Sequence, residues 1–164
     1  MKRLWAPWRM AYIKDAAKAS GCLFCRMAKS GKDEGNLVVF RGRLGLVMMN
    51  RYPYNSGHLM VAPFRHLAKI EALTDRESAE LFRLAGRSVR ILSRVMKPQG
   101  YNLGMNLGRV AGAGVLGHLH LHIVPRWSGD TNFMPLLGDT KVVAEALEAT
   151  YKKLVQGFQR SLKR

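Results

Sequence analysis

Three of the five histidines in this 164-residue chain occupy alternate positions, at His118, His120 and His122. Leucine or isoleucine fills the position after each of them. Because side chains alternate between the two faces of a β-strand, we predict a strand over residues 118–124 that presents the imidazoles on one face and its aliphatic side chains to a core. Three histidines in succession on one face, beside a glycine-rich loop, favour a chemical role over a solvated surface.

Imidazole chemistry leaves two functions open for this face. A His-x-His pair on a strand offers two nitrogen ligands to a zinc ion. Alternatively, a neutral ring nitrogen of one histidine attacks phosphorus and forms a phosphoramidate intermediate, while the flanking rings donate hydrogen bonds to phosphate oxygens. The spacing by itself does not choose between these two chemistries.

The charge of the chain favours an anionic partner. Its 27 Lys and Arg residues against 11 Asp and Glu residues give a net charge of +16, which suits a nucleotide, a nucleic acid or an acidic membrane. No Asp or Glu occurs between Leu81 and Gly129, the stretch that contains the three histidines. Paired-carboxylate catalysis is therefore not expected there. The loop at residues 108–117 offers glycines and backbone N–H groups to a phosphate, although a flexible hairpin connection has the same composition.

Short apolar runs predict most of a β-sheet. The runs at residues 37–40 and 44–49 indicate a hairpin, and residues 58–62 indicate a third strand that Pro63 ends. Residues 101–107 are expected to form another strand before the histidine strand. Since the connections are short, these strands indicate an α+β fold with a mainly antiparallel sheet.

Two helices complete the expected fold. Thr74 and Glu77 form a capping box at the start of a long helix, which Pro98 ends. A basic, amphipathic C-terminal helix is expected over about residues 141–158. We expect residues 1–20 to form a basic and aromatic arm, and residues 21–164 to form a single domain.

The chain carries no apolar run long enough to span a bilayer, and Pro7 and Arg9 interrupt the apolar segment that a signal peptide needs. We therefore expect a cytoplasmic protein without a membrane partner. Cys22 and Cys25 are its only cysteines. In a reducing compartment, a C-x-x-C pair indicates metal or redox chemistry more often than a disulfide.

The segment His118-Leu-His-Leu-His-Ile-Val124 resembles the signature of the histidine triad (HIT) superfamily of nucleotide hydrolases and transferases. Further motifs resemble the bacterial branch of this superfamily that contains the diadenosine tetraphosphate phosphorylases. They are Leu4-Trp-Ala-Pro-Trp-Arg-Met10, Cys22-Leu-Phe-Cys25, Gly57-His-Leu-Met-Val61, Ala111-Gly-Ala-Gly-Val115, Pro125-Arg-Trp127 and Gly129-Asp-Thr-Asn-Phe-Met134. The resemblance covers about residues 4–135 and implies a HIT-like fold.

This resemblance implies a mechanism in which His120 is the nucleophile. It attacks the α-phosphorus of a dinucleoside polyphosphate and carries AMP as a nucleotidyl-histidine, while His118 and His122 shape and charge the site. The family orients its nucleophile through a backbone carbonyl, which fits the lack of nearby carboxylates. The resemblance also implies a homodimer. The substrate-binding positions that match the family or lie beside its motif are Asn50, His58, Asn106, Gly112, Gly114, Val115, Arg126 and Trp127.

A structural zinc site is also implied by the resemblance. Zinc-bearing members of the family place their second pair of ligands where His66 and His118 stand, so the expected ligands are Cys22, Cys25, His66 and His118. Two ordinary reduced cysteines are the alternative. Four protein ligands leave no open position for substrate, so a zinc ion here would be structural. No organic cofactor is expected.

The residue at position 114 indicates the acceptor. Hydrolases related to the diadenosine triphosphatases carry a glutamine four residues before the first histidine of the triad, where this chain has Gly114. A glycine opens space beside the intermediate, and Arg109 and Arg126 raise the local phosphate concentration. We therefore predict phosphorolysis, in which diadenosine tetraphosphate and inorganic phosphate give ATP and ADP. The alternatives are a hydrolase of dinucleoside polyphosphates or adenosine phosphoramidates, and, in another class, a basic zinc-containing nucleic-acid binding module. We do not expect nucleic acid as the partner.

Overall fold

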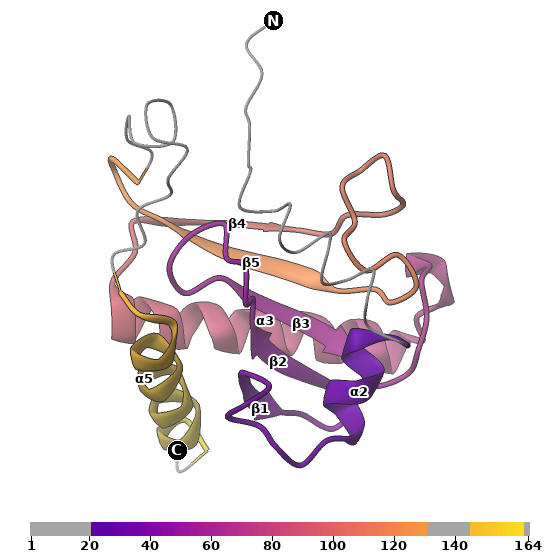
Figure 1. Cartoon of the computed structure of the whole chain (residues 1–164), viewed down its shortest axis with the longest axis horizontal. Coiled ribbons are helices and arrows are strands. Elements are labelled where there is room, and N and C mark those ends of the chain that lie inside the picture. The colour runs from indigo at the N-terminus through magenta and orange to yellow at the C-terminus, as the bar shows by residue number, and fades with distance from the viewer. Residues whose placement is uncertain (1–20, 131–144, 163–164) are drawn as a thin grey trace, which may run out of the picture.

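The computed structural model describes residues 21–130 and 145–162. Within these residues the chain forms an α+β fold around a five-stranded antiparallel sheet, in the order β1-β2-β3-β5-β4 (Figure 1). The predicted N-terminal arm, the motif at residues 4–10, residues 131–134 and the start of the predicted C-terminal helix lie outside the described residues.

The predicted hairpin and third strand are confirmed as β1 (Val38–Arg41), β2 (Gly45–Met49) and β3 (Leu59–Pro63). β1 pairs with β2, and β2 pairs with β3 along its whole length. The last two strands are β4 (Gly100–Gly104) and β5 (Leu121–Arg126), and β5 lies between β3 and β4. The strand that contains His122 is therefore an interior strand of the sheet, paired on both sides.

The predicted limits of the last two strands were wrong. β5 begins at Leu121 instead of residue 118, because the backbone N–H of Leu119 donates to the carbonyl of Leu67 and not to a neighbouring strand. β5 also continues through Pro125, which the sequence placed beyond its end. β4 ends at Gly104, which pairs with His122 near the start of β5, so residues 105–107 have no paired partner in the ladder.

The long helix α3 (Asp75–Met96) begins at the predicted capping box. The Thr74 side chain accepts a hydrogen bond from the backbone N–H of Glu77, and the Glu77 carboxylate accepts one from the backbone N–H of Thr74. Lys97 follows the helix in the left-handed conformation (φ 49°), directly before Pro98. These local signals fix both ends of α3 as the sequence predicted.

Helices α3 and α5 (Leu147–Arg160) cover one face of the sheet (Figure 1). The core between them takes alternate strand residues, including Val47, Val61 and Leu121, together with Leu92 of α3 and Leu154 of α5. The C-terminal helix was predicted, but it begins at Leu147 within the described residues.

A short helix that the sequence did not predict, α2 (Leu23–Lys29), packs on the opposite face of the sheet (Figure 1). Its Phe24 is 1% exposed and packs against strand residues such as Leu46, Met48, Met60 and Ala62. A turn of 3-10 helix, η1 (Ile70–Ala72), precedes α3.

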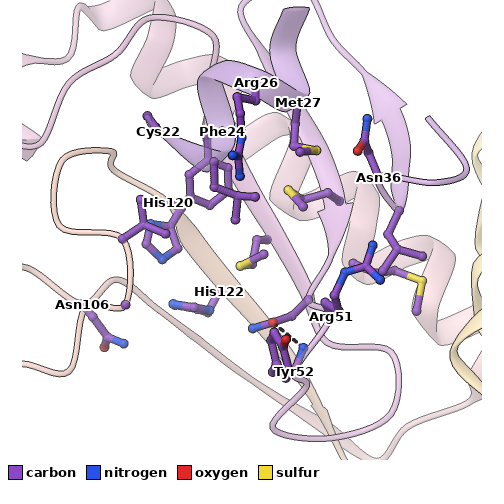
Figure 2. A pocket seen from close by; sticks show the side chains of 18 of the residues that line it. Cys22, Phe24, Arg26, Met27, Asn36, Arg51, Tyr52, Asn106, His120 and His122 are labelled. Atoms are coloured by element: carbon purple, nitrogen blue, oxygen red, sulfur yellow. Dashed lines mark hydrogen bonds between the residues drawn. The ribbon is translucent and has the colours of Figure 1, made fainter. Parts of the chain in front are cut away.

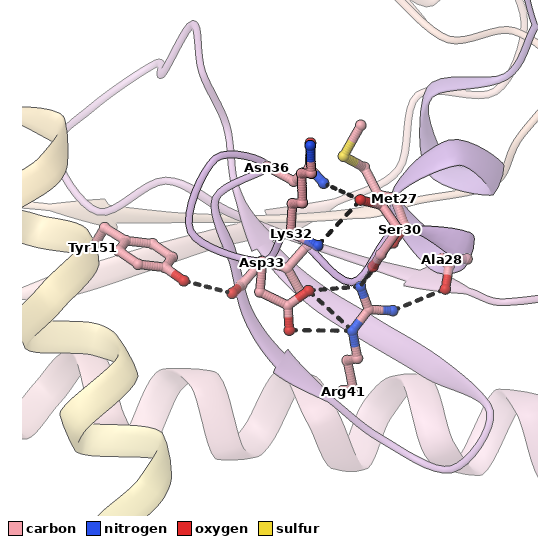
Figure 3. A network of polar contacts seen from close by, with 9 residues as sticks. Met27, Ala28, Ser30, Lys32, Asp33, Asn36, Arg41 and Tyr151 are labelled. Carbon is pink, nitrogen blue, oxygen red and sulfur yellow. Dashed lines mark hydrogen bonds and ion pairs between the residues drawn. The ribbon is translucent and has the colours of Figure 1, made fainter.

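Arg41 at the end of β1 fastens the C-terminal end of α2 to the sheet (Figure 3). Its guanidinium donates to the carbonyl oxygens of Met27, Ala28 and Ser30, and it pairs with the carboxylate of Asp33 at 2.7 Å. The last carbonyls of a helix have no partner within it, and a cation there also interacts favourably with the helix dipole. Arg41 thereby holds the helix that carries Cys22, Phe24 and Cys25.

Candidate functional site

A pocket of about 400 Å³ opens on the face of the sheet that carries α2. Figure 2 shows His120, His122 and Asn106 at one end of this pocket, and Asn36 and Arg51 at the other. Apolar side chains, among them Phe24, Met48 and Met60, also line the pocket. A pocket with a long apolar wall and histidines at one end suits a ligand with a flat apolar part and a reactive polar part.

His120 is held with one nitrogen ready to react. Its Nδ1 lies 2.8 Å from the backbone carbonyl oxygen of His118, and a carbonyl can only accept, so Nδ1 carries the hydrogen. In the neutral ring, Nε2 then has the free electron pair. Burial lowers the pKa of His120, and the hydrogen bond to His118 raises it by less. The lowered pKa favours the neutral form of the ring.

His122 is oriented by a chain of hydrogen bonds that begins at Tyr54, in the segment between β2 and β3. The backbone N–H of Tyr54 donates to Nδ1 of His58 at 3.1 Å, so His58 has its hydrogen on Nε2 and donates to Nδ1 of His122 at 2.9 Å. A neutral His122 ring therefore has its hydrogen on Nε2. The rings of His120 and His122 lie 4.8 Å apart, so the pocket combines an unprotonated ring nitrogen with a protonated one.

His118 faces away from this pair. Its Nε2 lies 2.8 Å from the carbonyl oxygen of Pro63, which leaves Nδ1 without a hydrogen. Nδ1 lies 3.3 Å from Sγ of Cys22 and 3.6 Å from Sγ of Cys25. The His118 side chain is 1% exposed, and burial lowers its pKa. Its side chain therefore belongs to a cysteine and histidine cluster, while its backbone carbonyl orients His120.

The cluster of Cys22, Cys25, His66 and His118 has its four candidate ligand atoms within 4.8 Å of one another. His66 closes the set, with Nδ1 3.3 Å from Sγ of Cys25. Two thiolates and two imidazoles are a donor set that zinc prefers, and the carbonyl of Pro63 supplies the outer hydrogen bond that metal-bound histidines usually make. The structure thus brings together the four residues predicted from the sequence, and their chemistry fits a metal ion.

Five of the predicted substrate-binding residues line the pocket: Asn50, Asn106, Gly112, Gly114 and Val115. His58 is 0% exposed and lies behind His122, so it acts on the pocket through that ring. Arg126 lines a second pocket that adjoins the first. Its guanidinium pairs with the Asp130 carboxylate at 2.7 Å, so the charge that was expected to attract phosphate is offset. Among the described residues, Trp127 lines neither pocket, and its assignment to substrate stays a prediction.

Sequence reasoning missed much of the pocket wall. Met48 and Met60 were assigned to strands, and their alternation with Val47 and Val61 would have placed them on the face that carries His122 once the register was known. Phe24 packs on both His118 and His120, with ring centroids 5.1 and 4.8 Å away. Its place between the two cysteines was the available signal.

No helix in the described part of the chain is both long and apolar enough to cross a membrane. This finding agrees with the lack of a long apolar run in the sequence. The cytoplasmic location stays a prediction.

Comparisons with known proteins find relatives over most of the chain. The family model of the HIT domain matches residues 32–129. An AP-4-A phosphorylase of Mycobacterium tuberculosis is 41% identical over 98% of this chain and 86% of its own length. An adenosine 5'-monophosphoramidase of Schizosaccharomyces pombe is 31% identical over 64% of this chain and 74% of its own. A zinc-bound histidine triad family protein from Mycobacterium smegmatis has a similar fold, with a TM-score of 0.68, 21% identity, and coverage of 87% of this chain and 96% of its own.

Proposed function

This chain belongs to the HIT domain family, and on that basis we propose that it transfers a nucleotidyl group from a dinucleoside polyphosphate to inorganic phosphate. The observation that carries the proposal is the pair of rings in the pocket, with an unprotonated Nε2 on His120 beside a protonated Nε2 on His122. The name of the Mycobacterium tuberculosis relative supports the substrate class.

In the first step, the electron pair on Nε2 of His120 attacks the α-phosphorus. A nitrogen–phosphorus bond forms, the bond from phosphorus to the bridging oxygen breaks, and the remaining polyphosphate leaves with that electron pair. The attack makes the His120 ring cationic, and the carbonyl of His118 stabilises its Nδ1–H. His122 donates its Nε2–H to the phosphate oxygens, where negative charge develops.

In the second step, an oxygen of inorganic phosphate attacks the same phosphorus and the bond to Nε2 breaks. The products from diadenosine tetraphosphate are ATP from the first step and ADP from the second. Gly114, which lines the pocket, leaves room for the incoming phosphate where a longer side chain would compete. Asn50 and Asn106 are the amide side chains that we assign to the ribose and the phosphates.

A zinc ion held by Cys22, Cys25, His66 and His118 would supply structural support, because four protein ligands leave it no site for substrate. Its ligand His118 also provides the carbonyl that orients His120. Holding the His118 side chain therefore fixes the backbone to which the nucleophile is hydrogen-bonded.

We also propose that the chain forms a homodimer. β4 is an edge strand of the sheet, and Leu103 on β4 and Phe82 on α3 are 48% and 68% exposed. Within the described residues the outer edge of β4 has no partner strand, and such an edge together with exposed apolar side chains favours association with a second copy. Sedimentation analysis of the full chain tests this state directly.

Hydrolysis is the second candidate, since the Schizosaccharomyces pombe relative is named as a phosphoramidase. In that reaction water replaces phosphate in the second step. Incubation of diadenosine tetraphosphate with labelled inorganic phosphate separates the two. We expect label in ADP and little turnover without phosphate. Unlabelled AMP and ATP formed at the same rate without phosphate would show a hydrolase, and a lack of any turnover by folded protein would overturn the proposed substrate class.

A further inference from the structure

A second pocket of about 340 Å³ is lined by residues of β4 and β5 and adjoins the first pocket at His122. Tyr54, Asn106 and His122 line both pockets, so the two are neighbours across the reacting position. A dinucleoside polyphosphate has two nucleosides, and the mechanism above uses a binding site for only one of them.

The strand register explains why this second surface is open. Gly104 of β4 pairs with His122, and Asn102 pairs with Val124, so these four residues share one face of the sheet. A Cβ at Gly104 would meet no atom within 4 Å. The backbone there does not have the positive φ that favours glycine. The missing side chain at residue 104 therefore leaves free surface directly beside His122.

The chemistry of the pocket suits a nucleobase better than a phosphate. Asp130 binds the guanidinium of Arg126 through two contacts of 2.7 and 3.0 Å, and Asn102 accepts a third hydrogen bond from it at 2.8 Å. The charge of Arg126 is thus offset, and its planar group is held in place, where it can stack on an aromatic ring. Val124 and the ring of Tyr54 add apolar surface.

We propose that this second pocket binds the nucleoside of the leaving half of the substrate. The polyphosphate then passes His122 and Asn106, two of the three residues common to both pockets, and the two nucleosides lie on opposite sides of the reacting phosphorus. This inference rests on the proposed function, and it assigns the surface of β4 and β5 to substrate recognition.

The test compares ligands that differ in one nucleoside. Dissociation constants are measured by calorimetry for AMP, adenosine 5'-tetraphosphate and diadenosine tetraphosphate, in a His120→Ala background that prevents turnover. The second nucleoside should improve binding about tenfold over adenosine 5'-tetraphosphate, as expected when one base stacks in a formed site. Gly104→Phe fills the open surface beside His122 and should abolish this difference while leaving AMP affinity within about twofold.

Two variants control for side effects of the substitution. Gly104→Ala adds only a Cβ in open space and should keep the difference between the two tetraphosphates. Gly31→Phe adds the same ring at another open glycine, which lines neither pocket, and should leave all three affinities as they were. Thermal unfolding confirms that each variant is folded.

The outcomes separate this inference from the function on which it rests. Equal affinity of the parent for the two tetraphosphates would show that no second nucleoside site exists. The inference would also be wrong if Gly104→Phe still bound diadenosine tetraphosphate more tightly than adenosine 5'-tetraphosphate. It would be wrong as well if the variant's affinity for AMP fell as much as its affinity for diadenosine tetraphosphate. If wild-type protein binds AMP but never turns over diadenosine tetraphosphate, the proposed function fails instead.

Discussion

The two faces of the sheet are built from alternate residues of the same strands and serve different ends. On one face, Val47 and Val61 pack under α3 and α5 in a core that takes only apolar side chains from the strands. On the other face, Met48 and Met60 share the surface with His122, and α2 covers only part of it. The closed face provides stability, and the incompletely covered face leaves the space for a ligand.

The strand side chains that line the pocket also differ in type from those of the closed face. The strands give the closed face mostly branched aliphatic side chains, together with Met49, and all of them are buried in the core under α3 and α5. Where the open face lines the pocket, its strands contribute Met48 and Met60, whose flexible thioethers adapt to irregular ligand shapes. This contrast predicts that substitutions on the open face change activity, whereas substitutions on the closed face change stability.

His120→Ala should have the largest effect on activity. We expect the rate to fall below about 1% of the wild-type rate, because no other side chain among the described residues of the pocket has an oriented, unprotonated nitrogen to carry the nucleotidyl group. Steady-state rates with diadenosine tetraphosphate and phosphate measure this loss. A variant that keeps more than a few per cent of the rate, with an unchanged melting temperature, would point to attack by water.

Cys25→Ser tests whether the open face depends on a metal for its stability. Cys25 belongs to the metal cluster but lines neither pocket. Loss of one ligand should lower the free energy of unfolding by several kcal/mol and reduce the zinc content below one ion per chain. Elemental analysis and chemical denaturation measure the two effects. If wild-type protein without zinc is equally stable, the metal does not contribute to folding. A Cys22→Ser, Cys25→Ser double variant should lose little more unfolding free energy than either single variant.

Leu154→Ala tests the closed face. Leu154 of α5 is 0% exposed in the core between α5 and the sheet. The cavity should cost about 2–5 kcal/mol of unfolding free energy, while kcat and KM well below the melting temperature stay close to wild type. Leu162→Ala is the matched control, since Leu162 is 63% exposed and should cost little. A large loss of kcat in a folded Leu154→Ala protein would mean that the two faces are not independent.

The smallest expected effect is at the start of α3, one of the two helices that cover the closed face. The Arg65 guanidinium and then the backbone N–H of Thr74 lower the pKa of Glu77 from its usual 4.5 to about 2. The folded pKa lies below the unfolded one, so this carboxylate stabilises the fold above pH 4.5, and the contribution is lost as the pH falls from 4.5 to about 2.

Glu77→Gln should therefore cost about 1 kcal/mol at pH 7, and the difference from wild type should shrink as the pH approaches 2. Denaturation curves at several pH values measure this dependence. Asp75→Asn, at an exposed position in the same first turn, should cost only a few tenths of a kcal/mol. Equal costs for the two variants at every pH would contradict the role of the capping box.

Local patterns predicted the parts of the fold that depend on neighbouring residues. The capping box at Thr74 and the stop at Pro98 fixed α3, because their hydrogen bonds and sterics act within a few residues. The hairpin of β1 and β2 followed in the same way. Helix α2 escaped prediction, since it is only seven residues long and depends on contacts such as those of Arg41, which is 13 residues from Ala28.

The sequence alone determined which side chains are available for chemistry. They are three alternating histidines beside a glycine-rich loop, in a stretch without carboxylates, and two cysteines near the start of the chain. The tertiary structure decided what each histidine does. One hydrogen-bond partner selects which nitrogen of each ring carries the hydrogen: the carbonyl of His118 for His120, the His58 ring for His122, and the carbonyl of Pro63 for His118. Two of these partners lie 64 and 55 residues away in the chain, so no local pattern contains them. Alternation places imidazoles on a face, but only the folded contacts set their protons, and the protons distinguish a nucleophile, a hydrogen-bond donor and a metal ligand.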